Sequence, residues 1–184
     1  MKHIALPLTR ETACTLRCGD QVLLTGTLYT ARDAAHKRLC EALQKGEALP
    51  VELQNITIYF AGPAPAAPGQ VIGPCGPTTS YRMDAYSPAL IHAGLTGMIG
   101  KGRRSREVIA AMQDRAVYFG ATGGCGTLIA RCIKKAEVVA YPDLGAEAIH
   151  KLEVVDFPVT VIIDAAGNDL YENGPAQYLA KATR

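Results

Sequence analysis

Strong net charge and long apolar runs are both missing from this sequence. Its 184 residues carry 19 basic and 17 acidic side chains, a formal net charge of +2. That imbalance is too small to indicate a nucleic acid or an anionic membrane surface as partner. No apolar run approaches the roughly 20 residues of a membrane-spanning helix. Residues 1–7 (MKHIALP) lack the longer apolar stretch of a secretory signal, so we expect a cytoplasmic protein.

The cysteines lack the spacing of a metal site. There is no C-x-x-C motif, and no histidine stands at ligand spacing from a cysteine. Cys14-x-x-x-Cys18 is only a weak motif for a metal or an iron–sulfur cluster. Without secretion, disulfides are not expected. We therefore predict reduced thiols and no metal ligands in this chain. The six cysteines are Cys14, Cys18, Cys40, Cys75, Cys125 and Cys132.

Several catalytic signatures are absent as well. The sequence has no G-x-x-x-x-G-K-[ST] phosphate loop, no H-E-x-x-H motif, no Ser-His-Asp order and no paired carboxylates. Residues 123–126 (GGCG) resemble a phosphate-binding loop in composition only. They are more typical of a place where two backbones, or a backbone and a ligand, approach closely.

What the sequence does contain is an alternation of strand and helix patterns. This alternation predicts an α/β domain spanning residues 1–184. The early strands and a late hairpin-like turn at residues 165–168 favour a mixed sheet or a barrel-like β layer flanked by helices. Proline- and glycine-rich residues 61–77 predict an ordered, irregular excursion. Strands are expected at residues 21–30, 55–60, 96–99, 116–120, 137–141, 159–164 and 169–171, and helices at 31–45, 83–93, 106–115, 127–135 and 144–151.

Residues 76–84 (GPTTSYRMD) form the most informative segment. Glycine and proline make a rigid turn, Thr78 and Thr79 add hydroxyls, and Arg82 follows four residues after Thr78. Backbone N–H groups, hydroxyls and a guanidinium around one space suit a carboxylate or a phosphate. The segment therefore predicts an anion pocket where a loop enters a helix.

Two further cations follow predicted strands. Arg32 comes directly after residues 21–30, and Lys101 lies between Gly100 and Gly102 at the end of residues 96–99. With Arg82 they give three cations at the edges of three elements. Two carboxylates require two cationic clamps, so the set suits a dicarboxylate. It lacks a strong acid or an electrophile, which makes it half of a site.

Other polar side chains have weaker support. His36 is a candidate acid or base four positions after Arg32, although a lone helical histidine is more often structural. The run Arg103, Arg104 and Arg106 predicts a solvated basic face rather than a site.

These segments together resemble one known family. The segments TGTLYTARDAAHKRL, GPTTSYRMD, GKGRRS, ATGGCG and LGAEAIHKLEVVDFPVTVIIDAAGNDLY are similar to the β subunit of two-subunit class I fumarate hydratase. The same region forms the C-terminal domain of single-chain class I fumarases, and L(+)-tartrate dehydratase β subunits are relatives. The resemblance covers about residues 19–171.

The resemblance implies a swivelling β/β/α domain and a hydro-lyase that reversibly hydrates fumarate to L-malate. It implies a [4Fe–4S] cluster held by three cysteines of a partner α subunit, not by this chain, and a homo-oligomer of αβ units. By motif, Arg32, Arg82 and Lys101 match carboxylate-binding residues. Thr78 matches the threonine proposed as base, with Thr79 beside it.

Four alternatives remain open from the sequence. The first is an L(+)-tartrate dehydratase β subunit, which would use the same residues on another hydroxy acid. The second is a stand-alone anion-, phosphate- or nucleotide-binding protein that uses the turn at residues 76–79. The third is a redox or metal protein that uses the scattered cysteines. The fourth is a non-catalytic assembly partner.

Overall fold

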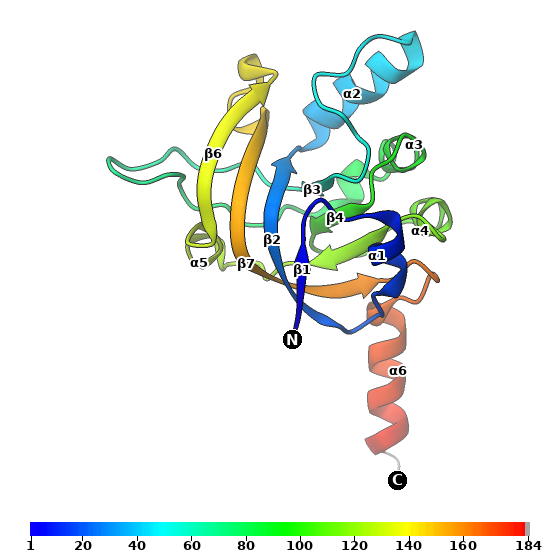
Figure 1. The fold of residues 1–184 in the computed structure, drawn as a ribbon. Helices are drawn as coiled ribbons and strands as arrows, with labels where there is room; N and C mark the ends of the chain where they lie inside the picture. The colour runs from blue at the N-terminus through cyan, green and yellow to red at the C-terminus, as the bar shows by residue number, and fades with distance from the viewer. Residues whose placement is uncertain (183–184) are drawn as a thin grey trace.

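The computed structural model describes residues 1–182 and contains one seven-stranded sheet (Figure 1). Its order is β1-β2-β3-β4-β5-β7-β6, with a further pairing between β2 and β7. The strands are β1 (Lys2–Ala5), β2 (Gln21–Thr30), β3 (Thr57–Tyr59), β4 (Gly97–Gly100), β5 (Val117–Gly120), β6 (Ile133–Ala140) and β7 (Ile149–Ile163).

The two long strands close the sheet on itself. Strands β2, β3, β4 and β5 pair in parallel, β5 then pairs antiparallel with β7, and β7 returns antiparallel to β2. Strand β1 adds to the sheet by pairing in parallel with β2, and β6 adds to it by pairing antiparallel with β7. The expected mixed sheet with a barrel-like layer is confirmed.

Helices flank this layer, and successive side chains along a strand pack into two different cores. Met98 and Tyr118 pack with residues of the helices, whereas their neighbours Ile99 and Phe119 belong to the other buried cluster, with Phe157 of β7. This follows from the opposite directions of successive strand side chains. The helices are α1 (Arg10–Thr15), α2 (Asp33–Lys45), η1 (Ser80–Met83), α3 (Ser87–His92), α4 (Arg106–Met112), α5 (Gly126–Ala130), η2 (Pro142–Glu147) and α6 (Leu170–Ala182).

Some predicted elements are wrong in type or extent. The helix expected at residues 127–135 ends at Ala130, and β6 begins at Ile133 because this segment pairs with β7. Residues 144–151 are not one helix: η2 ends at Glu147 and β7 starts at Ile149. Only Asp169 continues the late hairpin, as one bridge to Ile163, before α6 begins.

The helix expected at residues 83–93 is divided in two. The 3₁₀ turn η1 ends at Met83, and α3 starts at Ser87 with Pro88 in its first turn. Proline suits the first turn of a helix but cannot continue a preceding one, because it has no N–H to donate. The division leaves Asp84 as the C-cap of η1, where its side chain is available for other bonds.

Residues 61–77 leave the body as an irregular arm (Figure 1). A backbone hydrogen bond from Ala64 to Pro74 (3.0 Å) ties its two sides together, and the arm contains no charged residue. Gly73 lies where a Cβ would stand 2.4 Å from the carbonyl oxygens of Ala64 and Pro65, so glycine permits this close approach. Among the residues described, no helix has the length and apolarity that a membrane span requires.

Candidate active site

The candidate site lies at the carboxyl ends of the parallel strands. Arg32 follows β2, the arm and the turn at residues 76–84 follow β3, and Lys101 follows β4. Since parallel strands end at the same edge of a sheet, ligands commonly bind in the space outside those ends. The topology thus brings together segments that are far apart in the sequence.

Arg32 is the N-cap of α2, and its side chain is 23% exposed. Its Nη2 lies 3.1 Å from Oε1 of Glu147, and its Nε lies 3.8 Å from Oδ1 of Asp33. Gly62 at the base of the arm leaves room for it, because a Cβ there would stand 3.2 Å from Arg32 Cδ. Arg32 is therefore held in place by two carboxylates.

The turn at residues 76–84 begins beside β3 and contacts α2. The backbone N–H of Thr78 donates to the carbonyl of Phe60 (2.7 Å), which fixes the turn to the end of the strand. Arg82 lies in η1, and its Nη2 donates to Oδ2 of Asp33 (2.7 Å). Within residues 1–182, the hydroxyls of Thr78 and Thr79 make no side-chain hydrogen bond.

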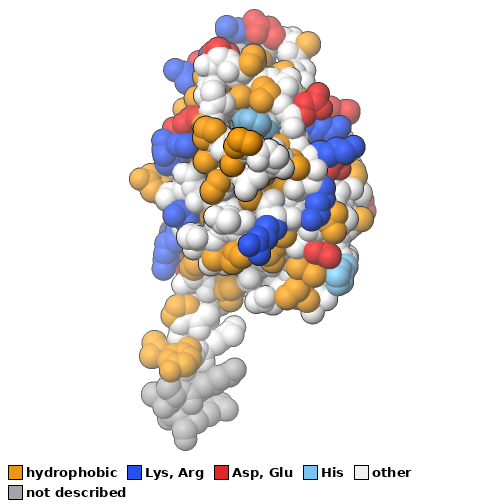
Figure 2. Space-filling model, turned by 90° about the vertical axis from the view of Figure 1, so that its left-hand side faces the viewer, with side chains coloured by type: hydrophobic (Ala, Val, Ile, Leu, Met, Phe, Trp, Pro, Cys, Tyr) orange, Lys and Arg blue, Asp and Glu red, His pale blue; other side chains and the backbone are white. Residues whose placement is uncertain are grey.

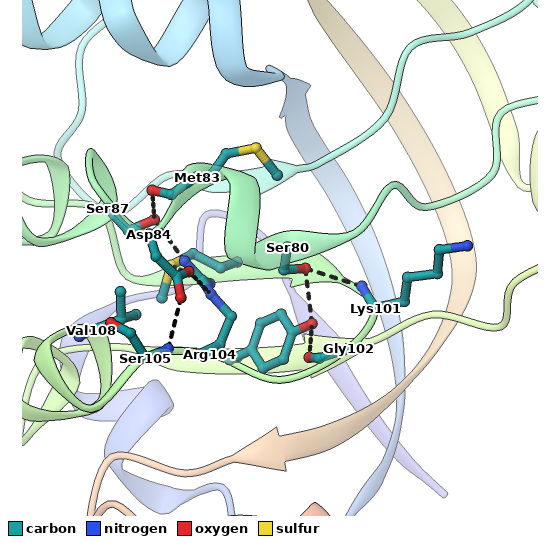
Figure 3. A network of polar contacts seen from close by, with 11 residues as sticks. Ser80, Met83, Asp84, Ser87, Lys101, Gly102, Arg104, Ser105 and Val108 are labelled. Carbon is teal, nitrogen blue, oxygen red and sulfur yellow. Dashed lines mark hydrogen bonds and ion pairs between the residues drawn. The ribbon is translucent and has the colours of Figure 1, made fainter.

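Lys101 is joined to the same turn by its backbone. Thr79 and Lys101 form a parallel bridge, and the N–H of Ser80 donates to the Lys101 carbonyl (2.9 Å). In return, the Lys101 N–H donates to Oγ of Ser80 (3.0 Å). Its side chain extends away from these bonds (Figure 3), and in the described part of the chain its ammonium has no ion-pair partner.

A buried polar network supports the turn from the interior (Figure 3). The Arg104 guanidinium, with a fully buried side chain, donates to Oδ1 of Asp84 (2.7 Å) and to Oγ of Ser87 (2.6 Å). Asp84 also accepts from the Ser105 N–H (2.6 Å). Tyr118 donates to the Gly102 carbonyl (2.9 Å) and contacts Ser80. Burial raises the pKa of Tyr118, so it stays a neutral hydrogen-bonding group.

This network corrects one expectation from the sequence. Arg103 and Arg106 are exposed, but Arg104 is not part of a solvated face: it is buried and its guanidinium stacks over the rings of Phe60 and Tyr118 at 5.2 and 5.1 Å. A guanidinium is hydrated more weakly than an ammonium and can stack on aromatic faces. The linear charge run could not reveal that its middle residue turns inward.

His36 lies in the core and not on the open edge. Its ring is fully buried, it contacts Phe60 edge-on, and its Nδ1 lies 2.9 Å from the Arg32 carbonyl oxygen. Burial lowers the pKa of His36 to about 4, helped by the positive charge of Arg104. The ring is therefore neutral at pH 7, and it contacts the backbone of the site rather than the open edge.

The glycine-rich segment at residues 123–126 makes the close approach expected of it. A Cβ on Gly126 would lie 3.0 Å from the backbone N of Gly76, and the Cys75 N–H donates to the Gly126 carbonyl (3.1 Å). A Cβ on Gly123 would lie 3.6 Å from Nζ of Lys101. This loop therefore borders the site on the side of Lys101.

The side chains that the structure describes do not fit an iron–sulfur cluster. No group of three or more Cys, His, Asp or Glu side chains among the described residues could hold a metal ion. All six cysteines are free, and Cys40 and Cys75 are buried. Burial raises the pKa of Cys75 to about 12, which disfavours the thiolate that a metal needs.

Two carboxylates of the site were not singled out from the sequence. Asp33 contacts both arginines, and it had a visible signal as an acid in the first turn of a helix directly after Arg32. Glu147 approaches from η2 and also accepts from the Ala34 N–H (3.3 Å). Its separation from Arg32 along the chain leaves no local signal, so only the β2–β7 pairing could reveal it.

Comparison with known proteins identifies the class. The model of a family described as "Fumarase C-terminus" matches residues 1–174. The chain is 41% identical over 156 residues to fumarate hydratase 2 of Leishmania major, covering 83% of this chain and 28% of that protein. It is 39% identical over 187 residues to the anaerobic class I fumarate hydratase of Escherichia coli K12, covering 100% of this chain and 33% of that protein.

A shorter relative matches along nearly its whole length. A putative L(+)-tartrate dehydratase subunit beta of Methanocaldococcus jannaschii is 37% identical over 179 residues, covering 94% of this chain and 92% of that protein. The chain therefore belongs to the fumarase C-terminus family, as the resemblance indicated. It spans about a third of the length of the fumarate hydratases it matches.

Proposed function

We propose that this chain is the β subunit of a two-subunit hydro-lyase that reversibly hydrates fumarate to L-malate. The observation that carries the proposal is the convergence of Arg32, Arg82 and Lys101 with the two free threonine hydroxyls at one edge of the sheet. Asp33 and Glu147 pair with Arg32 and Arg82, but each guanidinium keeps further N–H donors. Together with Lys101 and the threonine hydroxyls, which have no side-chain partner among the described residues, they suit a dianion with a carboxylate at each end. The family relatives support the same class of reaction.

In this mechanism the side chains of this chain bind the substrate and move one proton. Arg82 and Lys101 bind the carboxylate next to the carbon that loses its proton, and Arg32 binds the other carboxylate. During dehydration of L-malate, Thr78 Oγ1 takes that proton and the C–H electron pair forms the double bond. The hydroxyl group departs from the adjacent carbon, and the cluster assigned below to a partner chain would supply the Lewis acid that this departure requires. Arg82 and Lys101 stabilise the negative charge that builds on the carboxylate.

A threonine hydroxyl is a weak base in water and needs help to act. Nearby positive charges favour the ionised form of an acid. Lys101 is joined to Thr79 by backbone pairing and has no counter-ion within residues 1–182. An unneutralised cation beside the turn can therefore stabilise an alkoxide there.

A partner chain completes this proposed site. The chain corresponds to about a third of the length of its fumarate hydratase relatives, and the residues that the structure describes contain no group of side chains that could hold a metal ion. We assign the [4Fe–4S] cluster to an α subunit, with homo-oligomers of the αβ unit. The uncharged arm supports a protein partner: hydrophobic side chains occupy the middle of the face seen in Figure 2, with basic ones around them. A hollow of about 430 Å³ lies between the arm and β6, with Val71 and Val138 among its lining residues.

The test is anaerobic co-expression with the candidate α subunit, cluster reconstitution and an absorbance assay of fumarate formation from L-malate, with L-tartrate as the second substrate. Turnover of L-malate that needs both chains supports the proposal. Turnover of L-tartrate alone would assign the chain to the tartrate dehydratase β subunits, in line with its Methanocaldococcus relative. No turnover by either cluster-loaded mixture contradicts both assignments.

Two substitutions test the residue roles in that complex. Thr78→Ala should lower kcat by roughly 10²- to 10⁴-fold, as loss of a general base does, while Thr15→Ala, at the exposed end of α1, should leave kcat unchanged. Near-normal turnover by Thr78→Ala would remove Thr78 from the role of base. Arg82→Lys should also lower kcat/KM, because a point charge cannot replace the guanidinium fork, and the exposed Arg106→Lys serves as its control.

A further inference from the structure

Asp33 stands between the two arginines of the site. Its Oδ2 accepts from Nη2 of Arg82 at 2.7 Å, and its Oδ1 lies 3.8 Å from Nε of Arg32. Arg32 begins α2 and Arg82 lies in η1, so the two guanidinium groups come from separate segments. Asp33 is the side chain that contacts both of them.

Asp33 is held firmly where it lies. It is the first residue of α2, where the helix dipole favours a negative charge. Glu147 fixes the same helix end, because it accepts from the Ala34 N–H and pairs with Nη2 of Arg32. Arg32 therefore has one carboxylate on Nη2 and another facing Nε, and its guanidinium has little freedom to turn.

The contacts of Asp33 leave donors available. A guanidinium carries five N–H donors, and Asp33 receives one hydrogen bond from Arg82, through Nη2 alone. The Arg82 side chain is 41% exposed, so its remaining donors can reach a ligand. Oδ1 of Asp33 and Nε of Arg32 are both buried without a hydrogen bond. Asp33 thus orients the pair of arginines without saturating either one.

From this geometry we infer that Asp33 is a positioning residue that fixes the separation of the two carboxylate-binding arginines and so sets the length of the dicarboxylate that fits. The inference rests on the proposed function and deepens it. A fixed separation discriminates between dianions that differ by one methylene, whereas a loose Arg82 would accommodate both. The opposing reading is that Asp33 only occupies the arginines until substrate displaces it.

The test compares competitive inhibition by succinate and glutarate, dicarboxylates of four and five carbons, during L-malate turnover by the assembled enzyme. The wild type should prefer succinate by roughly tenfold or more, the discrimination expected for one methylene. Asp33→Ala should bring the two inhibition constants within about threefold and lower kcat/KM by roughly 10- to 100-fold. Asp33→Asn keeps an acceptor for Arg82, so its discrimination between succinate and glutarate should lie between those of the wild type and Asp33→Ala.

The matched control is Asp143→Ala. Asp143 lies in η2 and pairs with Arg38, which belongs to α2 like Asp33. This pair is exposed and lies outside the site. The Asp143→Ala variant should keep the wild-type ratio of inhibition constants. A general loss of stability would weaken both inhibitors equally, so the ratio separates positioning from folding. If Asp33→Ala fails to assemble, the near-isosteric Asp33→Asn must still bring the inhibition constants of succinate and glutarate closer together.

Two results of the inhibition assay would overturn the inference. One is an unchanged succinate-to-glutarate ratio in both Asp33 variants. The other is tighter succinate binding by Asp33→Ala, which would mark Asp33 as a competing anion. If the wild-type complex turns over neither L-malate nor L-tartrate, the proposed function fails. Calorimetric titration of the same complex with succinate and glutarate then tests Asp33 by itself, and absence of binding to the wild type counts against it.

Discussion

The two sides of the turn at residues 76–84 differ in how their polar groups are satisfied. On the interior side, Asp84 binds Arg104, and Ser80 binds both Tyr118 and the backbone of Lys101. On the open side, the threonine hydroxyls and the Lys101 ammonium have no side-chain partner within residues 1–182. Arg82 of the same segment is bonded to Asp33, so the groups left without a side-chain partner in front are the two threonine hydroxyls and the Lys101 ammonium.

This difference shows how a folded chain can present charge without mobility. Bonds on the interior side hold the backbone of the turn, so binding a ligand requires little further ordering. Preorganised donors that are unpaired in the free protein are the ones that can stabilise charge in a reaction. The predictions below test whether the interior side really supports the open side.

The largest effect is expected from Arg104→Met. The variant keeps an apolar side chain among Phe60 and Tyr118 but leaves the carboxylate of Asp84, which is 14% exposed, without its cation. Breaking a buried ion pair by removing one partner typically costs 3–5 kcal/mol, so the free energy of unfolding should fall by about 3–5 kcal/mol. Urea denaturation measures it.

The control for this variant is Arg38→Met. Arg38 pairs with Asp143 where the carboxylate is 61% exposed, and such surface pairs contribute little to stability. We expect its unfolding midpoint to stay close to that of the wild type. Equal losses in the two variants would mean that the interior network has no special role in supporting the turn.

A smaller effect is expected from Gly100→Ala, which adds one methyl group between the two sides. A Cβ at this position would lie 2.0 Å from Oγ of Ser80 and 2.9 Å from the Phe60 ring. The Ser80 contact must shift, and Lys101 with it. Overpacking of a core costs about 1–3 kcal/mol, and in the assembled enzyme kcat should fall further than the stability loss explains.

Gly174→Ala provides the comparison. It lies in α6, where the nearest side-chain atom would be 3.7 Å from the new Cβ. Pro175 follows directly, and the helical conformation is disfavoured for a residue that carries a Cβ before a proline, so this variant should lose some stability but keep its kcat. Full activity in Gly100→Ala would show that Lys101 does not depend on the Ser80 contact.

The open side of the turn was largely predictable from the sequence, and the interior side was not. Arg32 and Lys101 follow strands closely, the threonines follow a glycine- and proline-rich turn, and parallel strands place their carboxyl ends together. These are local signals combined with one topological rule. Arg104 was misjudged, because its neighbours Arg103 and Arg106 are exposed and nothing in the local pattern distinguishes it from them.

The secondary structure divides in the same way: elements set by local patterns were predictable from the sequence, and a strand set by long-range pairing was not. Strand β2 and helix α2 with its left-handed Gly46 cap agree with the predicted ranges, because apolar pattern and capping are local properties. The start of β7 at Ile149 was missed, since residues 149–154 form a strand through pairing with β2 and β6. Long-range pairing decides between helix and strand where the local pattern allows both.

The smallest effect, counted per pH unit, concerns His36, an exception among the bonded interior groups because its Nε2 is buried without a hydrogen bond. The folded state lowers the pKa of His36 from 6.5 to about 4, so between these values the unfolded chain binds the additional proton. Stability should therefore fall as the pH drops from 6.5 towards 4, by at most about 1.4 kcal/mol per pH unit from this group.

His36→Gln isolates that contribution, since an amide can still donate to the Arg32 carbonyl. Burial also lowers the pKa of His150, so the wild type has a second source of the same slope, and only the difference between the two proteins reports His36. The exposed His92→Gln should reproduce the wild-type slope. Parallel curves for wild type and His36→Gln in urea denaturation from pH 7 to 5 would mean that His36 accepts a proton without loss of stability. The interior side of the turn would then tolerate charge as the open side does.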